Sequence, residues 1–479
     1  KDYLGDIYHS EMVVVGKPNA FTNFSSRFQE SYFRTNKSYA SFRDANQNRD
    51  EIIYVGGNDG MLHAFDADTG IEKWAFIPPF MMGKMPLVIN PALNKKDNNE
   101  TFKGKGGSNA IYGVDGSPVV HDMFFEGPHD DREAWHTIMM VPFGRGGNGF
   151  TILDVTDPNK PLHLFTIYND SNANKILYMD HDGDNVIEYE YIDDIYSLDD
   201  FEESKEVLDK FKADNTIDET CESDLSLGTS CYKSDTWTFP IDNIQDGDVT
   251  VTVDGVDKTS NTTISVDATT KKTTFKFKDD QGNPLEYFYQ ANDSTQVGTS
   301  EPANIQIKLS RSKLTSLNTE LPAEFDYKEL GETWSSPRIL RVPNQAIADN
   351  NTLDDTYVAV MGAGYGGRAD NVGSAVFIIN LQDTFNDPST GTKMYGRLYE
   401  GKDDKKGIIL IEDTKPDVIE HDIINSVTGS PVVITSDIEP SANFSGGLVY
   451  VNDMEGKITK INLTNQQNTE MLDNNLLVV

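Results

Sequence analysis

The residues best suited to chemistry stand in one short acidic loop. Asp180, Asp182 and Asp184 alternate along the chain, and Glu188 follows four residues later. Counted from Asp180, these carboxylates occupy positions 1, 3, 5 and 9, and Val186 at position 7 could add its backbone carbonyl. Hard cations such as Ca²⁺ are bound by about six to eight oxygen atoms. The residue types and their spacing therefore predict a calcium site.

The loop differs from an EF-hand, which has glycine at position 6 and glutamate at position 12. This chain has Asn185 and Tyr191 at those positions. A strand-like run at 176–179 precedes the loop and another at 186–192 follows it, so we expect a strand–loop–strand site. The alternative is an ordinary turn in a very acidic chain, although three closely spaced carboxylates would repel one another without a cation.

The overall charge restricts the partners. The 479 residues include 41 Lys and Arg against 77 Asp and Glu, which gives a net charge of −36. Nucleic acids and anionic membranes need a basic protein surface, so neither is an expected partner. The chain has no run of about eighteen apolar residues, so we expect no membrane insertion. It starts at Lys1 without a signal peptide, which suggests a processed or truncated piece of a longer protein.

The two cysteines, Cys221 and Cys231, are ten residues apart in a polar segment. This spacing suits a local disulfide in an oxidising compartment, and two free thiols are the alternative. Two cysteines are too few for a four-cysteine zinc site, and the histidines form no HExxH motif. We therefore expect calcium as the bound metal and no metal chemistry beyond it.

A repeated β pattern predicts the fold. Short runs rich in Val, Ile, Tyr and Phe are separated by turns rich in Gly, Asn and Asp. One unit recurs, in which a strand follows a serine and a later apolar strand ends in glycines. Copies begin at 9–15, 116–120, 334–339 and 429–433, and 176–192 is a partial fifth copy. Such repetition is typical of an all-β protein of the β-propeller class.

Two insertions interrupt this pattern. The apolar stripe of 197–211 predicts a helix, and the two cysteines follow it, so the first insertion spans 197–234. Residues 241–310 hold five alternating strands and a hairpin turn at 279–283, which predicts a small β-rich domain. The expected organisation is a first propeller part over 1–240 that includes the acidic loop (176–192), an inserted β-rich domain over 241–310, and the propeller remainder over 311–479.

Several segments occur in an order that a known family shares. The most specific is Asn-Asp-Gly-Met-Leu-His-Ala-Phe at 58–65. The others are Leu-Gly-Asp-Ile at 4–7, the Gly-Gly to Leu-Asp-Val-Thr-Asp-Pro segment at 146–158, Gly-Glu-Thr-Trp-Ser-Ser-Pro at 331–337, and Gly-Leu-Val-Tyr-Val-Asn-Asp at 447–453. Together they resemble the C-terminal propeller of the PilY/PilC family, the type IV pilus biogenesis factors and tip adhesins.

The resemblance implies a modified, seven-bladed β-propeller, although the repeats alone do not establish seven blades. It implies an extracellular or cell-surface protein of the pilus tip. Such a protein acts with minor pilins, promotes pilus assembly, opposes retraction and attaches to a host or abiotic surface receptor. In that family calcium in an Asp-rich loop switches between extension and retraction. Asp180, Asp182 and Asp184 match that loop, and Glu188 replaces its last Asp.

Two other functions stay open at this stage. One is a pyrroloquinoline quinone dehydrogenase, whose propeller repeats are distantly similar. Those enzymes typically have a disulfide between adjacent cysteines, and Cys221 and Cys231 are not adjacent. The other is a secreted binding propeller unrelated to pili. We expect no enzymatic activity.

Three motifs that could suggest chemistry have simpler explanations. Asp59 and His63 could form a catalytic pair, but Asn58-Asp59-Gly60 favours a hairpin turn. The glycine-rich segment 144–149 lacks the Lys-Ser/Thr and the following helix of a phosphate-binding loop. The segment 154–157 could hold a second cation, but it precedes Pro158 and is better explained as a turn.

Overall fold

The computed structural model divides the chain into two compact units. Unit 1 comprises Lys1–Tyr191, Glu320–Asp413 and Ile423–Val479, and unit 2 comprises Ile192–Thr319 with Thr414–Asp422. The structure describes residues 4–22, 29–89, 111–130, 132–183, 186–192, 195–197, 230–234, 236–253, 256–285, 287–291, 305–310, 313, 316–318, 321–343, 355–366, 372–400, 407–411, 425–435, 445–464 and 473–478.

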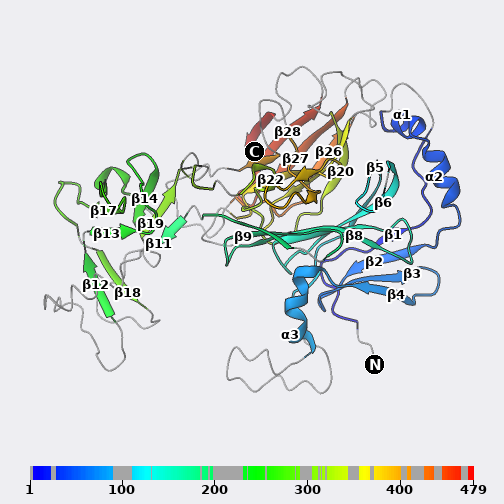
Figure 1. Cartoon of the computed structure of the whole chain (residues 1–479), viewed down its shortest axis with the longest axis horizontal. Helices are drawn as coiled ribbons and strands as arrows, with labels where there is room; N and C mark the ends of the chain where they lie inside the picture. The colour runs from blue at the N-terminus through cyan, green and yellow to red at the C-terminus, as the bar shows by residue number, and fades with distance from the viewer. Residues whose placement is uncertain are drawn as a thin grey trace. The chain divides into compact units, whose positions relative to one another are not determined.

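Four antiparallel sheets of one design make up most of the described part of unit 1 (Figure 1). In each sheet the strands pair in chain order, which is the arrangement of a propeller blade. The first sheet is β1 (Val13–Val15), β2 (Ile52–Gly56), β3 (Leu62–Asp66) and β4 (Glu72–Phe76). The second is β5 (Val119–Phe125), β6 (Ala134–Pro142), β7 (Gly149–Asp154), β8 (Leu162–Asp170), β9 (Lys175–Met179) and β10 (Val186–Glu190).

The third and fourth sheets come from the second half of the chain. The third is β20 (Arg338–Val342), β21 (Thr356–Gly362), β22 (Ala375–Asn380) and β25 (Ile408–Leu410), and the fourth is β26 (Val432–Thr435), β27 (Gly446–Asn452), β28 (Lys457–Thr464) and β29 (Asp473–Val478). A short hairpin of β23 (Phe385–Asn386) and β24 (Lys393–Met394) precedes β25. The expected all-β propeller class is therefore confirmed, and seven blades stay a prediction.

Hydrophobic cores lie between consecutive sheets. Ile52 of the first sheet shares a core with Met139 of the second, while the next residue on β6, Met140, shares another core with Met361 of the third. Val358 of the third sheet packs in a core with residues of the fourth. Successive side chains of a strand point to opposite faces, so each middle sheet buries both of its faces. This two-sided burial explains why the central strands read as continuous apolar runs rather than as alternating ones.

The acidic segment 176–192 does not form a further sheet of its own, which corrects the expectation of a partial fifth copy. A tight turn after β8 brings β9 back along it, and β10 then pairs with β9. Asn174 in this turn has a φ of 51°, a conformation that Asn tolerates better than most residues. Both strands therefore extend the second sheet, because the connection is too short to reach another one.

The helices of the described residues are short. They are α1 (Gln29–Asn36), α2 (Tyr39–Ala45) and α3 (Met85–Ile89), with 3₁₀ turns at Pro79–Lys84, Thr259–Asn261 and Ala323–Phe325. Phe33 and Tyr39 belong to the core between the second and third sheets, and the indole of Trp135 donates a hydrogen bond to the carbonyl of Lys37. Among the described residues, no helix has the length and apolar character needed to cross a membrane.

Close backbone contacts join one sheet to the next at the glycine-rich strand ends. A Cβ on Gly56 at the end of β2 would lie 2.0 Å from the carbonyl oxygen of Val114. A Cβ on Gly362 at the end of β21 would lie 2.1 Å from that of Val427. Because no side chain fits these gaps, the chain that leads into the next sheet can pass directly against the strand end.

A serine at the start of its repeat forms a hydrogen bond with each of these glycines. The hydroxyl of Ser10 accepts a hydrogen bond of 2.9 Å from the N–H of Gly56, and that of Ser335 accepts one of 2.9 Å from the N–H of Gly362. Both serines are buried and stand at the start of their repeat. The recurring serine in the sequence is thus explained by a buried backbone N–H that has to be satisfied.

Unit 2 is a small β domain with its own core. Its strands are β11 (Ile195–Ser197), β12 (Ser230–Ser234), β13 (Thr236–Phe239), β14 (Val249–Val253), β15 (Val256–Asp257), β16 (Thr262–Val266), β17 (Thr273–Phe277), β18 (Tyr287–Ala291) and β19 (Ile305–Leu309). They form the sheets β11-β19-β14-β15, β13-β17-β16 and β12-β18. Trp237, Phe275 and Ile307 lie in the core.

This unit begins at Ile192, whereas the sequence analysis placed the start of the β-rich domain at 241. The reason is that β11 and β13 are sheet partners of β19 and β17. The turn at 279–283 forms, with Asp279 accepting the N–H of Asn283 at 2.8 Å. However, the strands on either side of it pair mainly with other strands. The helix expected at 197–211 lies outside the described residues, apart from Ser197, which ends β11.

We predict that Ser10→Ala and Ser335→Ala each lower the free energy of unfolding by about 1–3 kcal/mol, because each leaves a buried glycine N–H without its acceptor. Thermal and urea unfolding of the purified chain measure the loss. Ser336→Ala is the matched control, since Ser336 donates its backbone N–H, not its hydroxyl, to Ser430. Losses no larger than that of the control would contradict the role given to the two hydroxyls.

Candidate functional site

The acidic loop joins β9 to β10 within the second sheet. The strands pair antiparallel from Met179 with Val186 to Lys175 with Glu190. Asp180 directly follows β9 and is buried, and its carboxylate accepts the N–H of Gly183 at 3.0 Å. Gly183 has a φ of 70°, so the turn needs a residue that tolerates the left-handed conformation. The expected strand–loop–strand arrangement is therefore present.

The structure places the predicted ligands in different settings. Asp182 is exposed in the loop, and its carboxylate lies 3.3 Å from the Nε2 of His181. Val186 is the first residue of β10. Glu188 lies within β10 rather than in the loop, and its carboxylate forms an ion pair of 2.7 Å with Lys175. Asp184 lies outside the described residues.

The donor chemistry suits a hard cation, because carboxylate oxygens are the ligands that Ca²⁺ prefers. Asp180 and Asp182 are brought to the same turn, while Glu188 could join them only by leaving Lys175. Within the described ranges, no three His, Cys, Asp or Glu residues are grouped closely enough to hold a metal ion. The calcium site therefore stays a prediction in which Asp184 is the third loop carboxylate.

The two strands that carry the loop are anchored to the β23–β24 hairpin. The hydroxyl of Tyr178 on β9 accepts the N–H of Tyr395 at 3.0 Å, and the hydroxyl of Tyr189 on β10 donates to Asp387 at 2.5 Å. Burial alone would raise the pKa of Asp387, but hydrogen bonds from Ser389, Tyr189 and neighbouring groups hold that pKa well below its usual range. The loop thus rises from strands held at fixed positions.

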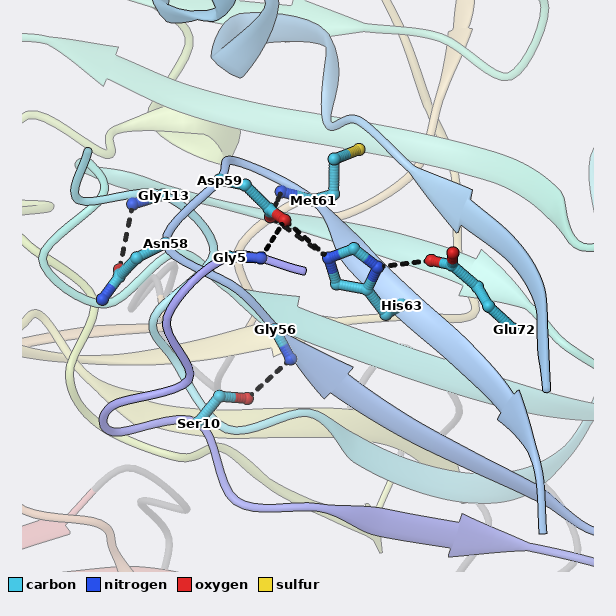
Figure 2. A network of polar contacts seen from close by, with 9 residues as sticks. All are labelled: Gly5, Ser10, Gly56, Asn58, Asp59, Met61, His63, Glu72 and Gly113. Atoms are coloured by element: carbon cyan, nitrogen blue, oxygen red, sulfur yellow. Dashed lines mark hydrogen bonds and ion pairs between the residues drawn. The ribbon is translucent and has the colours of Figure 1, made fainter. Parts of the chain in front are cut away.

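A second cluster of polar side chains surrounds the turn of the first sheet (Figure 2). The Nε2 of His63 on β3 lies 3.1 Å from both carboxylate oxygens of Asp59, and its Nδ1 lies 2.6 Å from the carboxylate of Glu72 on β4. Asp59 also accepts the N–H groups of Gly5 at 2.7 Å and Met61 at 3.2 Å. The network therefore ties the segment around Gly5 to the hairpin of β2 and β3.

This network supports the interpretation of Asn58-Asp59-Gly60 as a turn. Asp59 and His63 are both buried, and the Asp59 carboxylate is occupied by backbone donors as well as by the histidine. Gly60 has a φ of 90°, as the turn requires. An Asp–His pair with these partners holds the chain in place rather than activating a nucleophile.

Opposing effects set the charge of the network. Burial lowers the pKa of His63, but the hydrogen bonds with Asp59 and Glu72 outweigh it, and the net pKa lies above the ordinary value. Burial raises the pKa of Asp59, but the bond with His63 and the backbone N–H groups outweigh it, and the net pKa lies below the ordinary value. The pair is therefore an imidazolium–carboxylate ion pair in mildly acidic solution.

The second sheet contains a similar pair. His136 on β6 lies 2.8 Å from Asp154 at the end of β7 and 3.1 Å from Asp130. Asp154 also accepts the N–H of Thr156, and Asp157 accepts that of Asn159, as expected of turn residues. These bonds occupy the carboxylates that the sequence had suggested as a second cation site.

The cysteine pair is only partly described. Cys231 lies on β12 opposite Gln290, and Cys221 lies outside the described residues. The disulfide between them stays a prediction.

The four consecutive antiparallel sheets and the cores between them define unit 1 as a β-propeller. The resemblance seen in the sequence is confirmed, because the family model described as the PilY1 beta-propeller domain matches residues 4–191. That range contains the histidine network and the acidic loop. The type IV pilus biogenesis factor PilY1 of Pseudomonas aeruginosa strain UCBPP-PA14 is 37% identical over 175 residues, which are 36% of this chain and 13% of that protein.

Other relatives match to a similar extent. PilY1 of P. aeruginosa strain PAO1 is 40% identical over 156 residues, which are 32% of this chain and 11% of that protein. A PilY1 homolog of Xylella fastidiosa is 36% identical over 156 residues, which are 33% of this chain and 11% of that protein. The matches thus span little more than a tenth of these relatives' length.

The crystal structure of the P. aeruginosa PilY1 C-terminal domain aligns over 94% of this chain and 84% of that chain, with 15% identity and a TM-score of 0.25. At that score the two chains do not superpose as a whole. The propeller assignment depends on the sheets described above and on the family match.

We predict that the histidine network makes stability depend on pH. Because the pKa of His63 is raised in the folded state, the protonated histidine adds to folding stability. This stabilisation is complete below the pKa of the unfolded state, about 6.5, and is lost as pH rises through the pKa of the folded state. Because the pKa of Asp59 is lowered in the folded state, the ionised carboxylate also adds to folding stability. This stabilisation is complete above the pKa of the unfolded state, about 4, and is lost as pH falls. The network should therefore stabilise unit 1 most between about pH 4 and 6.5.

His63→Gln tests this expectation by thermal unfolding from pH 3 to pH 9. The wild type should melt at a higher temperature than the variant, and the difference should be largest near pH 5–6. There it should correspond to about 1–3 kcal/mol in the free energy of unfolding, and it should be smaller at either extreme of pH. His129→Gln, at an exposed histidine outside the network, serves as the control. A difference that is constant between pH 5 and pH 9 would rule out the ion pair.

Proposed function

We propose that this chain is part of a calcium-regulated type IV pilus biogenesis factor. The observation that carries the proposal is the match of residues 4–191 to the PilY1 beta-propeller domain. The curated relatives are named type IV pilus biogenesis factor PilY1 or a homolog of it. Since the matched residues are a small part of those proteins, the function of the whole is inferred for this chain and does not follow from the fold.

The proposed setting is the pilus tip outside the cell. There the protein would act with minor pilins to promote pilus assembly and oppose retraction, and it would attach to a host or abiotic surface receptor. The net charge of −36 supports a protein partner over nucleic acid or an anionic membrane. An oxidising exterior also suits the predicted disulfide between Cys221 and Cys231.

The proposed role is structural and regulatory rather than enzymatic. The family match favours it over a pyrroloquinoline quinone dehydrogenase and over a secreted binding propeller unrelated to pili. The Asp59–His63 pair, which could have suggested catalysis, is occupied by Gly5, Met61 and Glu72.

Calcium regulation is proposed from the acidic loop. Asp180, Asp182 and Asp184, the carbonyl of Val186 and the carboxylate of Glu188 would supply oxygen ligands. Without the cation the carboxylates repel one another, and Lys175 holds Glu188. With the cation the loop is ordered, and Glu188 is drawn from Lys175 toward the metal. Two arrangements that differ in charge and in partner make a switch that calcium can bias.

We predict that titration calorimetry of the purified chain detects one saturable calcium site. At a calcium concentration of 100 times Kd, the stability of unit 1 should rise by about 2.7 kcal/mol, because the ion binds the folded state alone. Asp182→Asn should weaken binding at least tenfold, since it removes a charged ligand from an exposed position where folding is not at stake. Glu188→Gln should weaken it less if Lys175 competes for that carboxylate.

Asp157→Asn is the matched control, because Asp157 is an exposed turn carboxylate of the same sheet whose acceptor role an amide oxygen can keep. No heat of binding, or equal binding by the Asp182 and Asp157 variants, would show that the loop is only a solvated turn. The calcium part of the proposal would then be withdrawn.

The pilus function needs a separate test in cells. In a strain that carries the full-length gene, removal of the gene should abolish or strongly reduce surface pili, and the wild-type gene should restore them. The Asp182→Asn gene should restore fewer pili than the Asp157→Asn gene when calcium is limiting. Normal piliation without the gene, counted by electron microscopy, would exclude a role in pilus biogenesis whatever the loop binds.

A further inference from the structure

A group of aromatic and cationic side chains gathers where the glycine-rich turns of unit 1 meet. We call it the aromatic–cationic surface and define it by Tyr8, Lys84, Tyr112, Arg145, Glu332 and Trp334. They come from five separate segments of the chain. Neither the calcium loop nor the histidine network uses any of them.

The backbone fixes these segments against one another. The N–H of Gly144 donates to the carbonyl of Thr333 at 3.2 Å, which places Arg145 beside Glu332 and Trp334. A Cβ on Gly146 would lie only 1.5 Å from the carbonyl oxygen of Gly113, which places Arg145 beside Tyr112. The surface is therefore built on turns that cannot move apart without breaking the contacts between sheets.

The aromatic rings are preoriented, and those of the two tyrosines are exposed. The Arg145 guanidinium lies 4.0 Å from the centre of the Tyr112 ring, and Tyr112 is 48% exposed. The His9 ring packs edge-on against both Tyr8 and Trp334, with centroids 4.1 Å and 4.6 Å away, and Tyr8 is 69% exposed. Trp, Tyr and Arg are the residues that most often carry the binding energy of protein interfaces.

The exposed charge of this surface is that of Arg145. Lys84 donates to the carbonyl of Gly146, and Arg145 lies over Tyr112, yet neither forms an ion pair with any other residue that the structure describes. The one carboxylate of the set, Glu332, accepts the indole N–H of Trp334 at 3.1 Å. A second carboxylate nearby, Asp115, is buried and bonded to His9. Lys84 and Glu332 are half-buried, so Arg145 is the exposed charge of this surface that has no ion pair among the residues described.

Burial makes these charges costly in the free protein. It lowers the pKa of Lys84, which Glu332 only partly offsets. Burial, together with the nearby Asp115, also raises the pKa of Glu332 despite Trp334, Arg145 and Lys84. An added anion beside Lys84 and Arg145 would therefore be favoured by the charges already present.

We propose that the aromatic–cationic surface binds an acidic segment of a partner protein. A carboxylate of that segment pairs with the Arg145 guanidinium, and a neighbouring aromatic or apolar side chain packs on Tyr8 and Tyr112. A planar guanidinium held over a ring is suited to bind a carboxylate through two hydrogen bonds, which a lysine cannot reproduce. This binding does not involve the acidic loop, so it can be tested independently of the calcium proposal.

The indole N–H of Trp334 is a built-in reporter. The chain has four tryptophans, so its indole region in a nitrogen–proton correlation spectrum holds four signals, and Trp334→Phe identifies the one at the surface. The probe is the peptide acetyl-Gly-Asp-Phe-Gly-amide, and its control is the same peptide with Asn in place of Asp. The protein is the whole chain described above.

The Asp peptide should shift the Trp334 signal in a saturable manner, with a Kd on the order of 1 mM for so small a ligand. The Asn peptide should bind at least tenfold more weakly. Arg145→Ala should weaken binding of the Asp peptide at least tenfold, and Arg145→Lys should recover only part of it. Arg43→Ala, at a half-buried arginine of α2 that pairs with the adjacent Asp44, should leave binding unchanged.

The proposal is overturned if the Asp peptide leaves the Trp334 signal unmoved, if both peptides bind equally, or if Arg145→Ala binds as well as the wild type. It is also overturned if the signal responds to protein concentration or to an acidic oligosaccharide such as sialyllactose but not to the peptide. Thermal unfolding of Arg145→Ala identifies a folding defect, and Tyr112→Ala then provides a second variant that should weaken binding at least tenfold.

Discussion

The direct contact between backbones of consecutive sheets is the constraint on which unit 1 depends. Val114 and Val427 each pass against a glycine at the end of the preceding strand, and in both places a buried serine satisfies the glycine N–H. Any side chain at Gly56 or Gly362 would separate the sheets and open the cores between them. Contacts of the same kind, between Gly146 and Gly113 and between Gly144 and Thr333, place Arg145 beside Tyr112 and Glu332, so the packing of the sheets also creates the aromatic–cationic surface.

Carboxylates in this acidic chain fall into two kinds, according to what surrounds them. Asp59 and Asp387 are surrounded by backbone N–H groups, hydroxyls or a histidine, and these donors lower the pKa of each. Such carboxylates are fully occupied and hold turns in place. Asp182 is exposed and, among the residues described, has His181 beside it, while Glu188 is held by a lysine that can release it. Free or releasable oxygens of this second kind are what a cation needs, which is why the acidic loop is the better candidate site.

The repeats and turns of unit 1 could be predicted because each is encoded locally. Serine, a β-branched run and terminal glycines recur at four places, and Asn-Asp-Gly specifies its own turn. Pairing between distant residues could not be predicted. Glu72 contacts His63 because the register of β3 and β4 shifts at Ala64 and Phe65, and no local signal marks that bulge. The early start of unit 2 was missed for the same reason, since β11 finds its partner more than a hundred residues later.

The position of the acidic loop in the chain gives it a further consequence. β10 ends at Glu190, and unit 2 begins at Ile192. Between them, Tyr191 donates its N–H to Asn174, in the turn between β8 and β9, and its hydroxyl to Asn169 on β8. A change in the loop would act first on β10, where Tyr189 and Tyr191 resist it, and only then on the start of unit 2. If calcium orders the loop, its effect should therefore be confined to the second sheet and the β23–β24 hairpin, unless the bonds of these two tyrosines give way.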